Sequence, residues 1–382
     1  MRLGGPHILP VAMFVGTFAW SFVYVSLPFH IQSISTADPV ATLRWTGWIL
    51  GISPLATVAT APAWGRLAER TNPKTCYVLT QWLQGLCFFG MALARTLPEL
   101  FVSRVVLGVA GAASTFAFIS VGRSESESEV RREIAAIQSG MTLGQVLGPL
   151  GGAIAAARLG FRASFVVGGL ILWGCGILVG WGLPAAADRR DTTPGERRTR
   201  VGDVLAVALI VLAGSTQVFF LTSILPQILP PLGVAADQTL EVGGILIFVT
   251  GVAAAIGALA TNRLAELVPE RRLIMGLLLA ASVFQAALAL PGSVWLYGIV
   301  RFLQVLCIAP VFPLVIARIA RHAGGGVIGF VNSARMGAAF IGPVIATTLL
   351  SWTSPPALYL VLAAMGAACL PLAAMTRPRA RA

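Results

Sequence analysis

Charge is what this sequence has least of. Only 11% of its 382 residues are charged, against about 25% in an ordinary soluble protein. Acidic residues number 15 and basic residues 27, while hydrophobic residues make up 57% of the chain. This composition excludes a soluble globular domain and predicts an integral membrane protein.

Cysteine is also scarce, and motifs that carry catalysis are missing. The five cysteines show no CxxC spacing, so we predict buried free thiols and no metal site. HExxH, GxSxG and P-loop patterns do not occur, which argues against a polytopic membrane enzyme, and we predict no cofactor. Residues 1–30 resemble a signal peptide in having Arg2 before an apolar run, but that run is long enough to span a membrane and precedes no cleavage site.

Twelve apolar segments are each long enough to cross a membrane as a helix, which takes about 20 residues. Polar or Gly/Pro-rich connections separate them. Because backbone groups in hydrocarbon must hydrogen-bond within their own segment, and no β-barrel alternation is present, we predict twelve transmembrane α-helices. The spans are 8–29, 45–64, 76–94, 98–120, 134–157, 163–183, 204–225, 241–261, 273–290, 294–316, 327–350 and 357–375.

Basic residues are divided unequally between the two sides that these spans define. One side carries 20 of the 27, the other side four, and three lie inside spans. Since connections rich in Lys and Arg stay in the cytoplasm, both termini are predicted to be cytoplasmic. The basic residues are scattered over short segments without one continuous stripe, so we predict no nucleic-acid partner.

An internal repeat divides the chain in two. Motifs of the first half recur in the second at offsets of 197, 197 and 194 residues: RLAE at 66–69 and 263–266, Arg104 and Arg301, and Gly148-Pro149 and Gly342-Pro343. We predict an N-terminal six-helix bundle over 1–183, a cytoplasmic linker over 184–203 and a C-terminal six-helix bundle over 204–382, arranged as parallel repeats.

Three motifs in the first half match patterns of a known family. Residues 65–74 (GRLAERTNPK) are similar to a loop motif between helices two and three, with Glu69 for the usual Asp and Asn72 for the usual Gly. Arg104-Val-Val-Leu-Gly is similar to a helix-four motif, and residues 144–152 (GQVLGPLGG) to a helix-five signature of drug:proton antiporters. On these motifs the chain resembles the major facilitator superfamily. That resemblance implies an exporter of the multidrug group, working by alternating access in the inner cell membrane.

The loop motif and its repeat are the predicted gate. Glu69 is expected to accept charge-assisted hydrogen bonds from Arg123 and to release them as the halves move. The alternative is a solvated turn that only sets topology. The gating candidates are Gly65, Arg66, Glu69, Arg70, Lys74, Arg123, Arg263 and Glu266.

Small residues at three- and four-residue spacing leave one face of the fifth span without bulk, so a neighbouring helix can approach closely. The proline in this span permits a bend. Ordinary close packing and hinging are both compatible with this pattern. The motif residues are Gly144, Gly148, Pro149 and Gly152.

Arginines inside spans are costly and are therefore functional candidates. For Arg104 the resemblance implies proton coupling, with bonding to buried carbonyls as the alternative, and both Arg104 and Arg301 are also near enough to a span end to snorkel. Arg335 lies near the middle of its span, where we favour a cavity-facing role over a structural tether. By the resemblance, further substrate contacts are Trp20, Tyr24, Gln217 and Gln304.

No acidic residue lies in the middle of a predicted span: all 15 fall in connections or at span ends. Many cation exporters of the major facilitator superfamily carry such an acid, so this chain departs from the pattern of the family it resembles. We expect a positive or neutral cavity that favours anionic, zwitterionic or neutral amphiphilic solutes. If protons are the coupling ion, the spans contain no obvious group to carry them. Glu99 and His30, the nearest titratable groups, are expected at solvated span ends.

The sequence thus favours a monomeric secondary transporter of a small solute, most simply an exporter of drugs or metabolites. A specific transporter of an anionic metabolite or a sugar is the alternative within transport. A channel is disfavoured because no filter-like re-entrant segment or charged ring is present.

Overall fold

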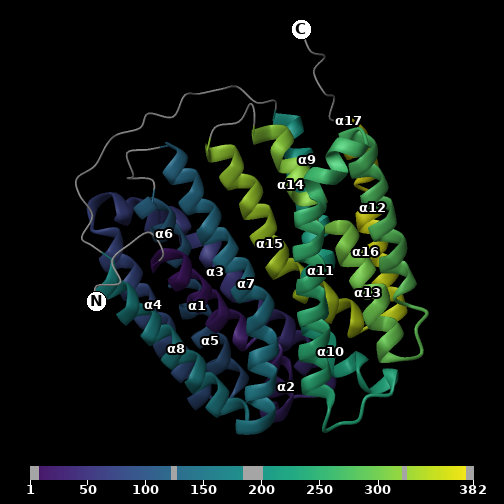
Figure 1. Cartoon of the computed structure of the whole chain (residues 1–382). Helices are drawn as coiled ribbons and strands as arrows, with labels where there is room; N and C mark the ends of the chain where they lie inside the picture. The colour runs from purple at the N-terminus through teal and green to yellow at the C-terminus, as the bar shows by residue number, and fades with distance from the viewer. Residues whose placement is uncertain (1–7, 122–126, 184–200, 321–324, 376–382) are drawn as a thin grey trace. The chain divides into compact units, whose positions relative to one another are not determined.

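A computed structural model describes residues 8–121, 127–183, 201–320 and 325–375. Side chains at 68–70, 118–121, 127–131, 262, 317–320, 325–329, 332 and 375 are outside this description. Within the described residues the chain is helical and contains no strand (Figure 1). The predicted all-α class is confirmed.

The chain forms two compact units, one of residues 1–192 with 237–248 and one of residues 193–236 with 249–382. The helices up to the predicted linker are α1 (Ile8–Phe22), α2 (Ser26–Ile34), α3 (Pro39–Arg70), α4 (Pro73–Leu93), α5 (Leu97–Val109), α6 (Ala113–Val121), α7 (Glu127–Leu159) and α8 (Phe161–Gly182).

After the predicted linker the helices are α9 (Val201–Phe219), α10 (Leu221–Ile228), the 3₁₀ helix η1 (Pro230–Leu232), α11 (Thr239–Leu267), α12 (Glu270–Ala287), α13 (Val294–Ile308), α14 (Val311–Ala320), α15 (Gly325–Leu350), α16 (Pro355–Ala367) and α17 (Leu370–Met375). Their ends follow local chemistry. Asp38, Asn72 and Thr96 cap α3, α4 and α5 through side-chain oxygens, and a proline follows each cap within two residues.

Nine helical segments of the described chain are long and apolar enough to cross a membrane. The three other predicted spans, 45–64, 134–157 and 273–290, lie on α3, α7 and α12, which are long helices with a more polar composition. Length alone therefore suits twelve crossings, whereas apolar composition supports nine.

Four of the apolar spans are broken near repeat-equivalent positions. In the first half the breaks fall at residues 23–25, between α1 and α2, and at 110–112, between α5 and α6. In the second half they fall at Phe220, between α9 and α10, and at 309–310, between α13 and α14. Pro28 contributes to the first of these breaks, because it has no N–H for the carbonyl of Tyr24. Some carbonyls at the breaks still accept turn hydrogen bonds, as those of Val23 and Phe220 do from the N–H groups of Leu27 and Ser223.

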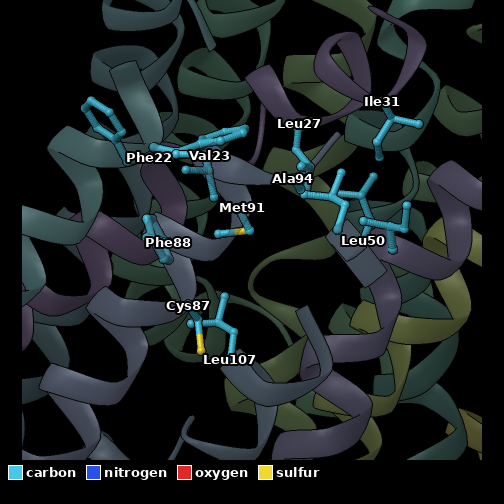
Figure 2. Packing of buried hydrophobic residues seen from close by; sticks show 14 of the residues in the cluster. Phe22, Val23, Leu27, Ile31, Leu50, Cys87, Phe88, Met91, Ala94 and Leu107 are labelled. Atoms are coloured by element: carbon cyan, nitrogen blue, oxygen red, sulfur yellow. The ribbon is translucent and has the colours of Figure 1, made fainter. Parts of the chain in front are cut away.

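A hydrophobic cluster of the first unit surrounds the break at residues 23–25. Figure 2 shows Phe22, Val23 and Leu27 beside Met91 and Ala94 of α4 and its following connection. All five are nearly or fully buried. The break is therefore packed inside the unit, where backbone groups need partners within the protein, and the Val23 carbonyl accepts from the Leu27 N–H and the Ser26 hydroxyl.

Candidate functional site

The loop motif between α3 and α4 makes two local contacts. The Asn72 side chain accepts a hydrogen bond from the backbone N–H of Lys74 at 3.0 Å and so caps α4. The Lys74 ammonium donates to the carbonyl of Leu183 at 2.5 Å, which ties the start of α4 to the end of α8. The asparagine that replaces the family's glycine thus has its own role as a helix cap.

Of the other gating candidates, Arg66, Arg263 and Glu266 are exposed, and Gly65 has open space around its α-carbon. The side chains of Glu69 and Arg70, and the whole of Arg123, lie outside the described residues. The ion pair of Glu69 with Arg123 stays a prediction.

Helices α1 and α7 lie side by side (Figure 1), and a ridge of glycines on α7 follows the backbone of α1. Cβ atoms built on the ridge would lie 1.5–2.6 Å from carbonyl oxygens of α1 that recur every four residues. Only glycine allows backbones to approach this closely. The pairs are Gly140 with Pro10, Gly144 with Phe14, Gly148 with Phe18 and Gly152 with Phe22.

Gly152 has the tightest contact, and it lies at the break that follows Phe22. Pro149, buried on the same helix, is the neighbour of Gly148 in the motif. The second half repeats the arrangement, since a Cβ at Gly342 on α15 would lie 3.3 Å from Phe220 N at the break after α9. In both halves, a glycine in or beside the Gly-Pro motif thus lies against a broken helix: Gly152 against α1 and Gly342 against α9.

Arg104 is fully buried on α5, and its guanidinium bonds to α3. Its Nε donates to the carbonyl of Ile49 and its NH2 group to the carbonyl of Leu50, both at 3.1 Å. Pro54 explains why the Leu50 carbonyl can accept this bond: a proline has no N–H for the carbonyl four residues earlier in a helix. Ser53 returns a bond, donating from Oγ to the Arg104 carbonyl at 2.6 Å. The Arg104 guanidinium thus lies among buried carbonyls, and its role in proton coupling stays a prediction.

Two aromatic rings next to the α1 break face the same guanidinium. The Arg104 carbon Cζ lies 6.0 Å from the ring centre of Trp20 and 5.8 Å from that of Tyr24, within cation–π range. Trp20 donates its indole N–H to Gln84 at 2.6 Å, and Gln84 donates to the carbonyl of Ala110 at 2.7 Å. A polar chain thus connects the breaks in the first and fourth predicted spans.

Arg301 is also buried, but it bonds to the broken helix itself. One terminal nitrogen donates to the carbonyl of Gln217 and to the side-chain oxygen of Gln304, both at 2.7 Å. The other donates to the carbonyl of Val218 at 2.8 Å. Carbonyls of a helix's last turn lack helical partners and carry the negative end of its dipole, so a guanidinium is well suited to the end of α9.

The polar cluster around Arg301 extends through the second unit. Gln304 donates to the side-chain oxygen of Gln217 at 3.1 Å, and Gln217 donates to the carbonyl of Leu362 on α16 at 2.8 Å. The ring of Phe220, at the break, lies 5.0 Å from the guanidinium carbon. Gln217 and Gln304, predicted as solute contacts, are thus fully buried within this cluster.

Arg335 is half-buried on α15, seven residues before Gly342. No aspartate or glutamate side chain is among the buried residues of the described chain. The guanidinium groups of Arg104 and Arg301 are therefore solvated by carbonyls, amides and rings instead of carboxylates. Such dipolar partners meet part of the requirement for burying a charge; within the described residues, one terminal nitrogen of Arg104 and the Nε of Arg301 are buried without a hydrogen-bond partner.

Among the titratable groups predicted at span ends, Glu99 is exposed as expected, but the prediction for His30 was wrong. His30 is 2% exposed, with its ring 5.4 Å from that of Phe161 and 5.1 Å from that of Phe165. The span continues to Ile34, past the predicted end at residue 29, which carries the histidine into the packed interior.

Sequence reasoning missed the partners of the buried arginines. Gln84 lies in the middle of an apolar span, and an amide in such a position was a signal that a backbone group needed a partner. Pro54 was another signal, because a proline inside a helix releases a carbonyl four residues earlier. The cysteine prediction fared better, since all five are free and four are buried.

Comparison with known proteins connects these features to a family. The profile described as Major Facilitator Superfamily matches residues 10–237 and 207–382. The uncharacterized MFS-type transporter YuxJ of Bacillus subtilis strain 168 is 24% identical over 334 residues, covering 85% of this chain and 84% of that protein. The multidrug resistance protein MdtG of Citrobacter koseri is 22% identical over 325 residues, covering 82% and 79%.

Solved structures share the fold at lower identity. A D-xylose–proton symporter superposes with a TM-score of 0.75 at 13% identity, covering 98% of both chains. The human organic anion transporter MFSD10 gives 0.70 at 16% identity, covering 96% of this chain and 98% of that one. With a family profile over nearly the whole chain, a helical fold shared with these transporters and the motifs placed above, the chain belongs to the Major Facilitator Superfamily.

Proposed function

We propose that this protein is a secondary active exporter of small organic solutes, such as drugs or metabolites. It accepts more than one substrate and works by rocker-switch alternating access in the inner cell membrane. The observation that carries the proposal is the set of four breaks, in the first, fourth, seventh and tenth predicted spans, near repeat-equivalent positions. Broken helices at the midplane are how transporters commonly build sites and hinges. The multidrug resistance protein MdtG, a relative over most of its length, supports export.

The proposed architecture has twelve crossings, in bundles over 1–183 and 204–382 joined by a cytoplasmic linker over 184–203, with both termini in the cytoplasm. The protein works as a monomer. Gating is assigned to the charged connections, and its test is Glu69→Gln. We expect this variant to insert normally and to transport more slowly, because a neutral amide binds arginine less strongly than a carboxylate does. Unchanged transport would remove the gate from the proposal.

The solutes are proposed to be neutral, zwitterionic or anionic amphiphiles. Arg104, Arg301 and Arg335 put three cations inside the predicted spans, and no acid is buried among the described residues. Trp20 and Tyr24 are the half-buried groups nearest the first break and are candidate solute contacts. Gln217 and Gln304 are candidates for contact when their mutual hydrogen bond opens.

A second function within the same class is specific transport of an anionic metabolite or a sugar. The three intramembrane cations favour it, and the similar folds include an organic anion transporter and a sugar–proton symporter. The two functions differ in breadth: an exporter of drugs accepts chemically unrelated solutes, whereas a specific transporter accepts one class.

The experiment is flux into proteoliposomes containing the full chain, with labelled anionic, neutral and cationic solutes under an imposed pH or sodium gradient. Gradient-driven flux of several unrelated neutral or anionic amphiphiles supports the exporter, and antiport with protons appears as dependence on the pH gradient alone. Flux confined to one anion or sugar supports the alternative. Faster flux of cations that persists in Arg335→Ala contradicts the positive cavity.

A further inference from the structure

A group of sulfur and polar atoms is buried in the first unit between α1, α4 and α8, and the proposed transport function does not use it. Gln81 of α4 donates from Nε2 to the Tyr77 hydroxyl oxygen at 3.1 Å and to Cys175 Sγ of α8 at 3.3 Å. The Tyr77 hydroxyl lies 3.6 Å from that sulfur and donates to Met13 Sδ of α1 at 3.7 Å. All four side chains are buried, the most exposed being Met13 at 3%. Four potential ligand atoms from three helices therefore lie together.

A glycine on α1 allows these atoms to converge. A Cβ built on Gly16 would lie 2.9 Å from Gln81 Nε2, 3.8 Å from the Tyr77 hydroxyl oxygen and 3.9 Å from Cys175 Sγ. Three heteroatoms thus face one point beside α1, and a side chain at this position would displace them. The absence of a Cβ at Gly16 leaves that point to the atoms of α4 and α8.

Hydrogen bonding within the group leaves acceptor capacity unused. The Oε1 atom of Gln81 is buried without a hydrogen-bond partner, although buried polar atoms normally have one. A half-turn about the last side-chain bond exchanges the amide oxygen and nitrogen, which places Oε1 against Cys175 Sγ and the Tyr77 oxygen. Sulfur is a weak hydrogen-bond acceptor, so the donors around it are poorly satisfied. A ligand that bonds to sulfur and oxygen would complete the group.

The spacing of the four atoms suits a tetrahedral metal ion. Ligand atoms with metal bonds of about 2.0–2.3 Å lie about 3.3–3.8 Å apart in a tetrahedral site. The four separations given above are 3.1–3.7 Å. Thiolate and thioether sulfur select soft ions such as Cu(I). Small adjustments of side chains alone would therefore bring the atoms to bonding distance of one ion.

Charge decides between a monovalent and a divalent ion. No aspartate or glutamate side chain is buried in the part of the chain that the structure describes, and no group of three His, Cys, Asp or Glu side chains there could hold a metal. One thiolate neutralises a monovalent cation, whereas a divalent cation would leave a positive charge in the interior without a counter-ion. The donor set thus disfavours Zn(II).

We propose that Met13, Tyr77, Gln81 and Cys175 form a binding site for one soft monovalent metal ion of the Cu(I) type, held chiefly by the two sulfurs. Binding replaces the Cys175 S–H bond with a sulfur–metal bond and releases the proton to water, with no change of oxidation state. The spacing between cysteines predicted no metal site because a single cysteine contributes, and its partner ligands lie on helices far apart in the sequence. The site does not depend on which solute is transported.

The test is an anaerobic titration of the purified full chain with Cu(I) in competition with a colorimetric chelator. We expect one tight site, and X-ray absorption should give its ion two sulfur neighbours at about 2.3 Å. Loss of outer partners of a metal site costs about 10–100-fold in affinity, so Cys175→Ser, which removes a ligand, should weaken binding by about 100-fold or more. Cys87→Ser is the matched control and should bind as wild type, because Cys87 is a buried cysteine of the same unit that lies among hydrophobic side chains (Figure 2).

Met13→Leu separates ligation from folding, because leucine keeps the volume of methionine but has no sulfur. In this variant the bound ion should have one sulfur neighbour, while thermal unfolding without metal should match that of wild type. Equal Cu(I) affinity of Cys175→Ser and Cys87→Ser would overturn the proposal. If Cys175→Ser does not fold, Met13→Leu decides: an ion with the same sulfur neighbours as in wild type would equally overturn it. A rise in melting temperature with Zn(II) as large as that with Cu(I) would contradict a monovalent site.

Discussion

Removing the guanidinium of Arg301 is the sharpest perturbation that the second unit offers. It takes away three hydrogen bonds, to the carbonyls of Gln217 and Val218 and to the side chain of Gln304. Hydrogen bonds between membrane helices contribute about 0.6–1.7 kcal/mol each. We therefore expect Arg301→Met to lower the free energy of unfolding by about 2–5 kcal/mol, from three such bonds.

The arginine of the first half sets the scale for comparison. Arg104 makes two side-chain hydrogen bonds, each at 3.1 Å, so Arg104→Met should cost about 1–3 kcal/mol. Arg301→Lys should fall between wild type and Arg301→Met, because an ammonium keeps the charge but lacks the planar fork that reaches acceptors on two helices. The expected order of stability is Arg95→Met, then Arg104→Met, then Arg301→Met, where Arg95 is exposed and serves as control.

The assay is thermal unfolding of the purified protein in one detergent, followed by solute flux in proteoliposomes. Hydrogen exchange over residues 216–224 adds a readout specific to the break after α9, where Arg301→Met should exchange faster than Arg104→Met does. Added guanidinium should restore part of the stability of Arg301→Ala. Unfolding and exchange of Arg301→Met that match those of Arg95→Met would refute the reasoning, since the three bonds would then stabilise nothing.

Two further predictions concern the first unit. Gly152→Ala places a Cβ 1.5 Å from the Phe22 carbonyl oxygen, so α1 and α7 must separate by about 2 Å to reach an ordinary contact of 3.4 Å. We therefore expect poor expression and lost transport. Gly174→Ala is the control, because Gly174 has open space around it and this variant should behave as wild type; equal behaviour of the two variants would contradict the close approach. Pro54→Ala supplies an N–H to the Leu50 carbonyl. In a double-mutant cycle of unfolding, it should therefore reduce the destabilisation caused by Arg104→Gln. Strictly additive losses of stability would show that the proline does not create the arginine's binding site.

Much of the fold followed from the sequence because the bilayer restricts what a chain can do. Apolar segments of sufficient length must be helices in hydrocarbon, and recurring motifs reveal the repeat. The glycines at 144, 148 and 152 predicted a close helix neighbour from their spacing alone. What the spacing did not contain was the identity of that neighbour, α1, or the regular pairing of its carbonyls with the ridge.

The buried position of His30 was not predictable in the same way. Hydropathy places the end of a span only to within several residues, and the histidine lies in that uncertain margin. Its burial depends on Phe161 and Phe165, which are more than 130 residues away in the sequence. From the neighbouring sequence alone, a polar residue near the end of a span is expected to have access to water. Packing against a helix that is distant in the sequence can remove that access.

The sequence by itself determined that this is a helical membrane protein built from a repeat, with arginines but no carboxylates inside its spans. Only the tertiary structure decided what those arginines do. Arg104 and Arg301 occupy equivalent positions, yet the first bonds to α3 and the second to the end of α9. In the first half Pro54 frees a carbonyl on α3, whereas the repeat-equivalent position on α11 is Gly251, which has its own N–H. The same side chain therefore bonds to whichever backbone oxygens its own half leaves without a donor.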